Sequence, residues 1–215
     1  ELPNISKQSL YLIIGASFIC TSLPVLADGH EQDNKSWMLG AGLGVMNTPR
    51  YLGSNHNKTK AMPMLKATYR TDYGTLGIGE DGGSPRIRWG FSPNKNSELG
   101  VQFGRDEGRK EQDDPSNLNG LGNVKTTVEY GIFASQRFDG LKLKISANKG
   151  ASSGHGGVVV NFKAEHECKL TESLGLQTGL GMSWASRKYM QRYFGVSTQQ
   201  SVDSGLKTYT AGSGF

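Results

Sequence analysis

Apolar and polar side chains alternate in two consecutive runs between residues 127 and 148. The apolar positions are Val128, Tyr130, Ile132, Ala134 and Phe138 in the first run, and Leu141, Leu143, Ile145 and Ala147 in the second. A period of two predicts β-strands with one apolar face. Asp139-Gly140, between the runs, favours the two-residue turn of a hairpin. In that hairpin Phe138 faces Leu141 and Ser135 faces Lys144, so the two faces differ in polarity.

The same alternation recurs along most of the chain and predicts ten strands. They cover residues 37–45, 61–70, 73–79, 86–91, 98–104, 127–138, 141–148, 158–165, 174–184 and, with weak alternation, 206–215. We expect longer loops at residues 47–58, 80–85, 105–123, 149–157 and 187–204, with tight turns elsewhere. Short turns that alternate with longer loops are typical of an outer-membrane β-barrel. The one candidate for helix is a short turn within residues 187–194.

The N-terminus has the features of a secretory signal peptide. Lys7 precedes an apolar run at residues 10–20, and Ala27 ends a small-residue cleavage site. The run is shorter than a spanning helix, which needs about 20 apolar residues, so a membrane anchor is the weaker alternative. Lipidation of Cys20 is disfavoured because Ile19, not a small residue, precedes it. We therefore expect residues 1–27 to be removed and residues 28–215 to form one barrel domain.

Composition adds few constraints to this picture. The chain has 24 Lys and Arg against 19 Asp and Glu, a net charge of +5. A modest positive excess favours anionic neighbours such as lipopolysaccharide phosphates, although solvated polar faces explain it equally well. Only Cys168 remains after cleavage, so no disulfide framework is expected. We expect lipid and lipopolysaccharide as neighbours and no nucleic-acid partner.

Aromatic residues near the ends of the expected strands fit a membrane-interface girdle. They are Trp37, Tyr69, Tyr130, Phe138 and Trp184. Strands of soluble sheets also carry aromatic residues, so a secreted sandwich or lipocalin-like barrel stays an alternative.

Several motifs, in order along the chain, resemble the MipA/OmpV family of outer-membrane proteins. They are Trp37 with residues 40–44, then residues 49–54, 104–105, 118–122, 154–157 and 189–196, and finally residues 204–206 with Tyr209. The resemblance implies an outer-membrane barrel that acts as a scaffold between murein-cleaving and murein-synthesising enzymes, or as a surface protein. It also implies two further strands beyond residue 215, and therefore twelve in the full-length barrel, an even number as in bacterial barrels.

Two groups of residues are candidates for function. On the polar face, which would line the lumen, the candidates are Arg86, Arg88, Lys142, Lys144 and Glu129. They would form either an anion-favouring channel or a plug of salt bridges. In the last long loop the candidates are Arg187, Tyr189, Arg192, Tyr193 and Phe194. Arginine and aromatic residues are enriched at interfaces, but a loop packed on the barrel rim is the plainer interpretation.

His155, beside Ser152 and Ser153, invites a hydrolase interpretation. The sequence places no orienting acid for it, although Glu165 or Asp139 are conceivable. His30, His56 and His166 show no metal spacing with it, and we expect no catalytic, cofactor or metal site. The preferred function is the one that the resemblance implies, a non-enzymatic scaffold in the outer membrane of a Gram-negative cell. The alternatives are a porin-like channel and, less favoured, a hydrolase at the rim.

Overall fold

The computed structural model describes residues 13–14, 18–21, 36–54, 56–81, 84–169 and 174–215. Most of the expected signal peptide lies outside these ranges, so its removal stays a prediction.

One antiparallel sheet dominates the described chain. Its long strands are β3 (Ser36–Pro49), β4 (Asn57–Thr71), β5 (Gly74–Asp81), β6 (Ser84–Asn94), β7 (Ser97–Asp106), β8 (Thr127–Phe138), β9 (Leu141–Gly150), β10 (Val158–Lys169) and β11 (Leu174–Ala185). Each pairs with the next in sequence order. The short strands β1 (Ile13–Ile14) and β2 (Phe18–Thr21) both pair with β11. The prediction of an all-β, antiparallel fold is confirmed.

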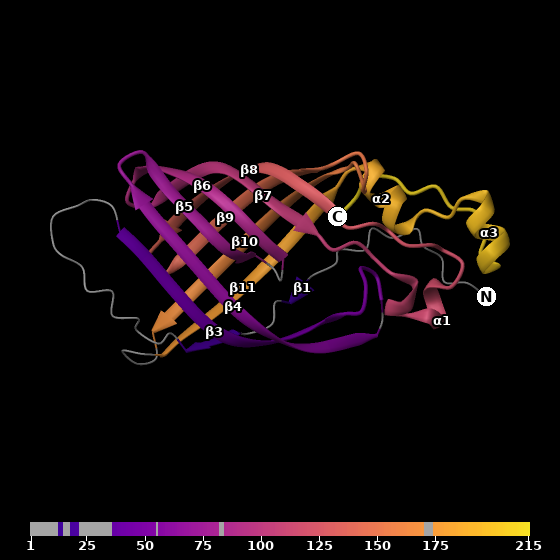
Figure 1. The fold of residues 1–215 in the computed structure, drawn as a ribbon, viewed down its shortest axis with the longest axis horizontal. Helices are drawn as coiled ribbons and strands as arrows, with labels where there is room; N and C mark the ends of the chain where they lie inside the picture. The colour runs from indigo at the N-terminus through magenta and orange to yellow at the C-terminus, as the bar shows by residue number, and fades with distance from the viewer. Residues whose placement is uncertain (1–12, 15–17, 22–35, 55, 82–83, 170–173) are drawn as a thin grey trace.

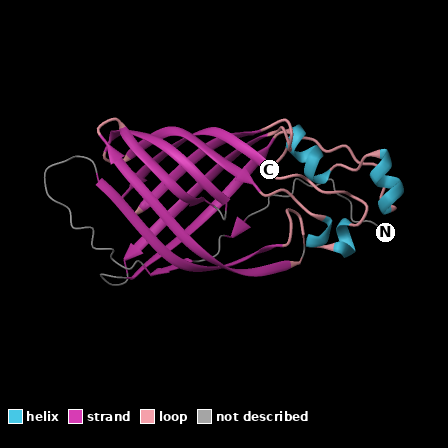
Figure 2. Cartoon of the chain, viewed as in Figure 1, coloured by secondary structure: helices cyan, strands magenta, loops and turns pink. Residues whose placement is uncertain are grey.

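The sheet curls round into a barrel-like shape with all its helices at one end (Figures 1 and 2). The helical segments are η1 (Glu111–Asp113), α1 (Pro115–Leu118), α2 (Arg187–Phe194) and α3 (Thr198–Ser204). They belong to the connections of residues 107–126 and 186–215. Residues 50–56 and 151–157 link strands at the same end, which we call the capped end. At the opposite end, the turn end, two-residue turns join β4 to β5, β6 to β7 and β8 to β9.

The hairpin of β8 and β9 has the predicted register. Phe138 pairs with Leu141 and Ser135 pairs with Lys144. The turn residues Asp139 and Gly140 have φ angles of 31° and 87°. Positive φ at both central positions is the requirement of a type I′ turn, and glycine meets it at little cost.

The burial pattern of this sheet is inverted relative to a soluble protein. On β8 the outward side chains of Tyr130 and Ile132 are 51% and 63% exposed, whereas the inward Glu129 and Ser135 are 4% and 9% exposed. A soluble sandwich buries its apolar face. Here the enclosed face is polar and the outer face is apolar, as in barrels whose outer face meets lipid. This decides against the soluble alternative.

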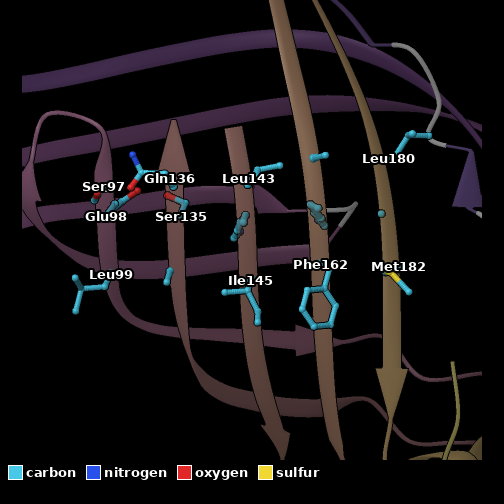
Figure 3. A pocket seen from close by; sticks show the side chains of 15 residues that line it. Ser97, Glu98, Leu99, Ser135, Gln136, Leu143, Ile145, Phe162, Leu180 and Met182 are labelled. Carbon is cyan, nitrogen blue, oxygen red and sulfur yellow. Dashed lines mark hydrogen bonds between the residues drawn. The ribbon is translucent and has the colours of Figure 1, made fainter. Parts of the chain in front are cut away.

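The outer face is hollowed across β7 to β11 (Figure 3). A groove of about 610 Å³ runs between Leu99, Ile145, Phe162, Leu180 and Met182. The small side chains of Ala134 and Ala164 on the same face leave this space. Its apolar lining suits hydrocarbon chains.

None of the described helices has the length and apolar composition to cross a membrane.

The structure corrects several of the sequence predictions. Residues 80–85 are not a loop, because β5 and β6 pair up to Asp81 and Ser84 and leave two residues between them. Residues 206–215 form no strand. Isolated bridges from Tyr209 to Val196 and from Gly214 to Ala185, and a hydrogen bond from Ala211 N–H to Gln191 Oε1, hold this segment in place. Residues 47–49 and 57–58 belong to β3 and β4 and not to the loop between them. In each case polar composition or weak alternation was a poor guide to backbone pairing.

Candidate functional site

A buried ion pair lies inside the barrel near the capped end. Arg86 on β6 donates from Nη2 to Glu129 Oε2 on β8 at 3.0 Å, and both side chains are largely buried. Arg86 Nη1 also donates to Asn148 Oδ1 on β9 at 3.4 Å. Gln102 on β7 reaches the same oxygen at 2.6 Å through its Nε2. The inward faces of four neighbouring strands are thus joined by polar contacts.

His155 joins this network from the β9–β10 connection. Residues 151–157 fold back into the barrel mouth, and the imidazole is 0% exposed. Gly157 N–H donates to His155 Nδ1 at 3.1 Å, while Nε2 lies 3.3 Å from Glu129 Oε1. Because Nδ1 accepts a hydrogen bond, the ring proton of the neutral imidazole sits on Nε2 and is donated to Glu129. Glu129 therefore receives hydrogen bonds on both carboxylate oxygens.

Glycines make room for this histidine. A Cβ on Gly150 would lie 2.1 Å from His155 Cε1, and a Cβ on Gly154 would lie 1.8 Å from Thr127 Oγ1. The same Thr127 oxygen accepts a hydrogen bond from the His155 backbone N–H at 3.1 Å. A Cβ on Gly157 would lie 2.5 Å from the backbone nitrogen of Tyr189. The Gly-His-Gly-Gly motif therefore lets a loop, a strand and a helix approach each other closely around one side chain.

Helix α2 covers the network from the outer side. Tyr189 packs edge-on against His155 with ring centroids 4.8 Å apart, and Tyr193 stacks on Tyr189 at 4.5 Å. The Tyr193 hydroxyl donates to Asp106, the last residue of β7. Both tyrosines are buried, together with Val124 and Ala185. The helix therefore closes the mouth at this point, with its aromatic face turned inward.

Burial raises the pKa of Tyr189 and of Tyr193 above the ordinary value of 10.0, and the nearby Asp106 carboxylate raises both further. A raised pKa in the folded state stabilises the fold below pH 10, and that stability is lost as pH rises above 10. We expect the free energy of unfolding to fall there by about 1.4 kcal/mol per pH unit for each tyrosine. Denaturant unfolding between pH 8 and pH 11.5 measures this slope.

The Tyr193→Phe variant should show a shallower alkaline slope, whereas Tyr209→Phe, which alters an exposed tyrosine, should keep the wild-type slope. Equal slopes for wild type and Tyr193→Phe would contradict the buried, protonated state of Tyr193.

Asp106, Glu129 and His155 offer ligand atoms within 4.8 Å of one another. The spacing alone would suit a metal ion, but the hydrogen bonds do not. His155 Nε2 carries its proton towards Glu129, and coordination through Nε2 would move that proton to Nδ1, against the N–H of Gly157. Arg86 and the Tyr193 hydroxyl also already bind the two carboxylates. The arrangement fits a hydrogen-bonded cluster better than a metal centre.

The acid beside His155 is Glu129, not Glu165 or Asp139, the residues that the sequence suggested. Ser152 and Ser153 are exposed, whereas the imidazole is buried. Within the described ranges, both ring nitrogens are bonded to Glu129 and Gly157 and no serine hydroxyl reaches them. This geometry lacks the hydroxyl-to-imidazole contact that a serine hydrolase needs.

A second polar cluster ties the loops of the capped end together. Asp114 is buried and accepts hydrogen bonds from Ser116, Asn117 and His56, which hold the pKa of its carboxyl below the ordinary value. Arg109 is also buried and donates from Nη1 to the Tyr193 carbonyl at 2.7 Å. These contacts join residues 50–56, residues 107–126 and α2 into one cap.

The structure places the five candidate lumen residues on the inward face at different depths. Arg86 and Glu129 form the ion pair near the cap. Arg88 and Lys144 lie deeper, each 5.9 Å from the centre of the buried Phe133 ring. Lys142 lies at the turn end, opposite Arg137 on β8 and Glu165 on β10.

The five candidate mouth residues divide into two sets. Tyr189 and Tyr193 point inward and are buried, and Phe194 is half-buried, with Cε1 3.2 Å from the position of a Cβ on Gly53. Arg187 and Arg192 are exposed. Sequence reasoning missed Asp106, Asn148 and Arg109. Asp106 and Asn148 lie at inward-facing positions of their strands. The alternation of polar and apolar residues along the sequence indicates these positions.

Comparison with known proteins identifies the family. A family model described as MltA-interacting protein MipA matches residues 41–215. No curated protein and no solved structure matches the chain. The matching family is associated with the outer membrane of Gram-negative bacteria. The match covers most of the sequence, including every segment of the cap, so the chain belongs to the MipA family of MltA-interacting proteins.

Proposed function

We propose that the protein is a non-enzymatic scaffold of the outer membrane, a capped barrel that holds a murein-cleaving enzyme of the MltA type at the membrane. The observation that carries this proposal is the closed mouth, where α2 and His155 are locked over the buried Arg86–Glu129 pair. A site built for hydrolysis would leave its imidazole open to substrate and beside a nucleophile. The buried, doubly bonded His155 serves structure instead.

The packing of side chains inside the barrel, below the cap, also supports the proposal. Gln102, Phe133, Lys144 and Asn148 are buried on the inward faces of β7, β8 and β9. Side chains that pack against each other in this way take up the space that a wide channel would need. A filled barrel is suited to presenting its ends to partners.

The turn end is the surface that we assign to the partner. Short turns of outer-membrane barrels face the periplasm, where murein and its enzymes lie. The most exposed aromatic residue of this end is Tyr73, at the tip of the β4–β5 turn, with 83% of its surface accessible. Lys95 and Arg137 at the neighbouring turns are exposed as well. Exposed tyrosine and arginine are the residue types most often found at the centre of interfaces.

We expect Tyr73→Ala to weaken binding of an MltA-type lytic transglycosylase about tenfold, because truncation of a central interface tyrosine removes roughly 1–2 kcal/mol. Surface plasmon resonance between that enzyme and the detergent-folded barrel measures the effect. The matched control is Tyr209→Ala, which removes an exposed tyrosine at the capped end and should leave binding unchanged. Unchanged binding by Tyr73→Ala, or equal loss in both variants, would refute the assignment to the turn end.

A channel for small anionic solutes is the second candidate function. The observation in its favour is the pair of cations, Arg88 and Lys144, that flank the Phe133 ring inside the barrel. Cations along a pore favour anions. Conductance in a planar lipid bilayer separates this candidate from the scaffold, because a channel conducts and a closed barrel does not.

A further inference from the structure

The outward face of α2 carries a group of cations that the closed mouth does not use. Arg187, Lys188 and Arg192 are exposed, whereas Tyr189 and Tyr193 of the same helix are buried. Within the described part of the chain, no salt bridge joins these three cations to an acid. Since the tyrosines anchor the helix, the cations are held together on a fixed surface.

Acids of the cap are engaged elsewhere. Asp106 accepts from the Tyr193 hydroxyl, Glu107 pairs with Arg105 at 2.7 Å, and Asp203 accepts from Gln199 at 2.8 Å. The positive charge on α2 is therefore not neutralised by these neighbours. It is available to an anionic partner from outside the chain.

The position of α2 along the barrel indicates which partner that is. Helix α2 begins two residues after β11 ends in Trp184-Ala185, at the rim of the capped end (Figure 1). Trp184 pairs with Val160, and Tyr130 lies between Phe103 and Lys149, all on the outward face of this rim. Outward aromatic residues mark the boundary between hydrocarbon and headgroups.

A second aromatic row lies at the turn end. Trp37 stacks on Tyr69 at 4.6 Å, and Phe138 is at the end of β8. From Tyr130 to Phe138 is about 26 Å along the strand at ~3.3 Å per residue, which a strand tilt of about 40° reduces to roughly 20 Å of height, within an apolar band of about 25 Å. The cations of α2 therefore lie just beyond this band, at the level of lipid headgroups on the long-loop side.

We propose that Arg187, Lys188 and Arg192 bind the phosphate groups of phosphorylated glycolipid headgroups in the outer leaflet. Long loops of outer-membrane barrels face outward, which places α2 beside that leaflet. Guanidinium groups bind phosphate oxygens through paired N–H donors, and Lys188 adds a point charge. This contact anchors the capped end in the headgroup layer. It does not depend on the murein enzyme proposed as partner of the opposite end.

The test is the affinity of the detergent-folded protein for lipid A carrying two phosphates, measured by native mass spectrometry. We expect R187Q/K188Q/R192Q to bind on the order of 100-fold more weakly, because each cation near an anionic lipid surface contributes roughly a factor of five. The control R70Q/K95Q/R137Q removes three exposed cations at the turn end and should bind like wild type. The change in gel mobility on heating reports whether each variant is folded.

Lipid A without phosphates should bind weakly to every variant, and inorganic phosphate at equal concentration should not displace lipid A. If the triple variant does not fold, Lys188→Gln alone should bind lipid A about fivefold more weakly than the wild-type protein. Wild-type affinity in the α2 variants, equal loss in both triple variants, or equal binding of dephosphorylated lipid A would overturn the proposal. Displacement by inorganic phosphate would instead identify a site for a soluble anion.

Discussion

Replacement of Glu129 by leucine is expected to lower the free energy of unfolding by about 3–5 kcal/mol, the usual cost of removing one partner from a buried ion pair. Glu129 accepts hydrogen bonds from Arg86 at 3.0 Å and from His155 Nε2 at 3.3 Å. Without it, the Arg86 charge loses its counter-ion, and both Arg86 Nη2 and the buried His155 N–H lose their acceptor, at the cost of their desolvation. Unfolding of the protein in lipid vesicles by guanidinium chloride, followed by tryptophan fluorescence, measures this change in the free energy of unfolding.

Two further variants isolate the buried charge as the cause. Glu107→Leu breaks the exposed pair with Arg105 and should cost less than about 1 kcal/mol. The double variant Arg86→Met/Glu129→Leu removes both charges and should recover most of the stability, since no charge is left unpaired. If Glu129→Leu is no more harmful than Glu107→Leu, the ion pair does not hold the cap.

The Gly150→Ala change is expected to cost up to about 3 kcal/mol, the range of overpacking in a well-packed interior. The added methyl would lie 2.1 Å from His155 Cε1, so either the ring or the strand must move. Gly77→Ala is the matched control, because nothing lies within 4 Å of its Cβ position on β5. That change should be neutral or slightly stabilising.

A double-mutant cycle assigns the cost to the contact itself. In a His155→Ala background the ring is gone, so Gly150→Ala should then cost at least 1 kcal/mol less than in wild type. Chemical denaturation of the four proteins under one condition gives this coupling. Additive effects would mean that Gly150 is needed for its backbone and not for the space that it leaves to His155.

Features of the fold that are set by residues close together in the chain can be predicted from the sequence, whereas features that depend on distant residues cannot. The β8–β9 register follows from alternation and the Asp139-Gly140 turn, which act over a few residues, and the observed pairing agrees. The segment at residues 80–85 was mispredicted as a loop because backbone pairing does not require apolar side chains. Helix α3 was missed although Ser197 and Gln200 form a capping box that was readable as a helix start.

The site was less accessible to sequence reasoning because its members are distant in the chain. His155 was singled out, but its acid comes from 26 residues away and its aromatic cover from α2. Asp106 meets Tyr193 across 87 residues. Such contacts depend on strand register and on where loops fold back, and one sequence without its fold does not define either. The inward position of Glu129 was predictable, whereas its partnership with His155 was not.

Helix α2 and His155 close the barrel at its capped end. The most direct test is conductance of the full-length refolded protein in a planar lipid bilayer, with Tyr189→Ala/Tyr193→Ala measured beside it. We expect the wild-type protein to be folded, heat-modifiable and electrically silent. We expect occasional openings in the double variant, whose cap lacks the rings that pack over His155. Stable, anion-selective steps from the wild-type protein would contradict the closed mouth and establish a channel.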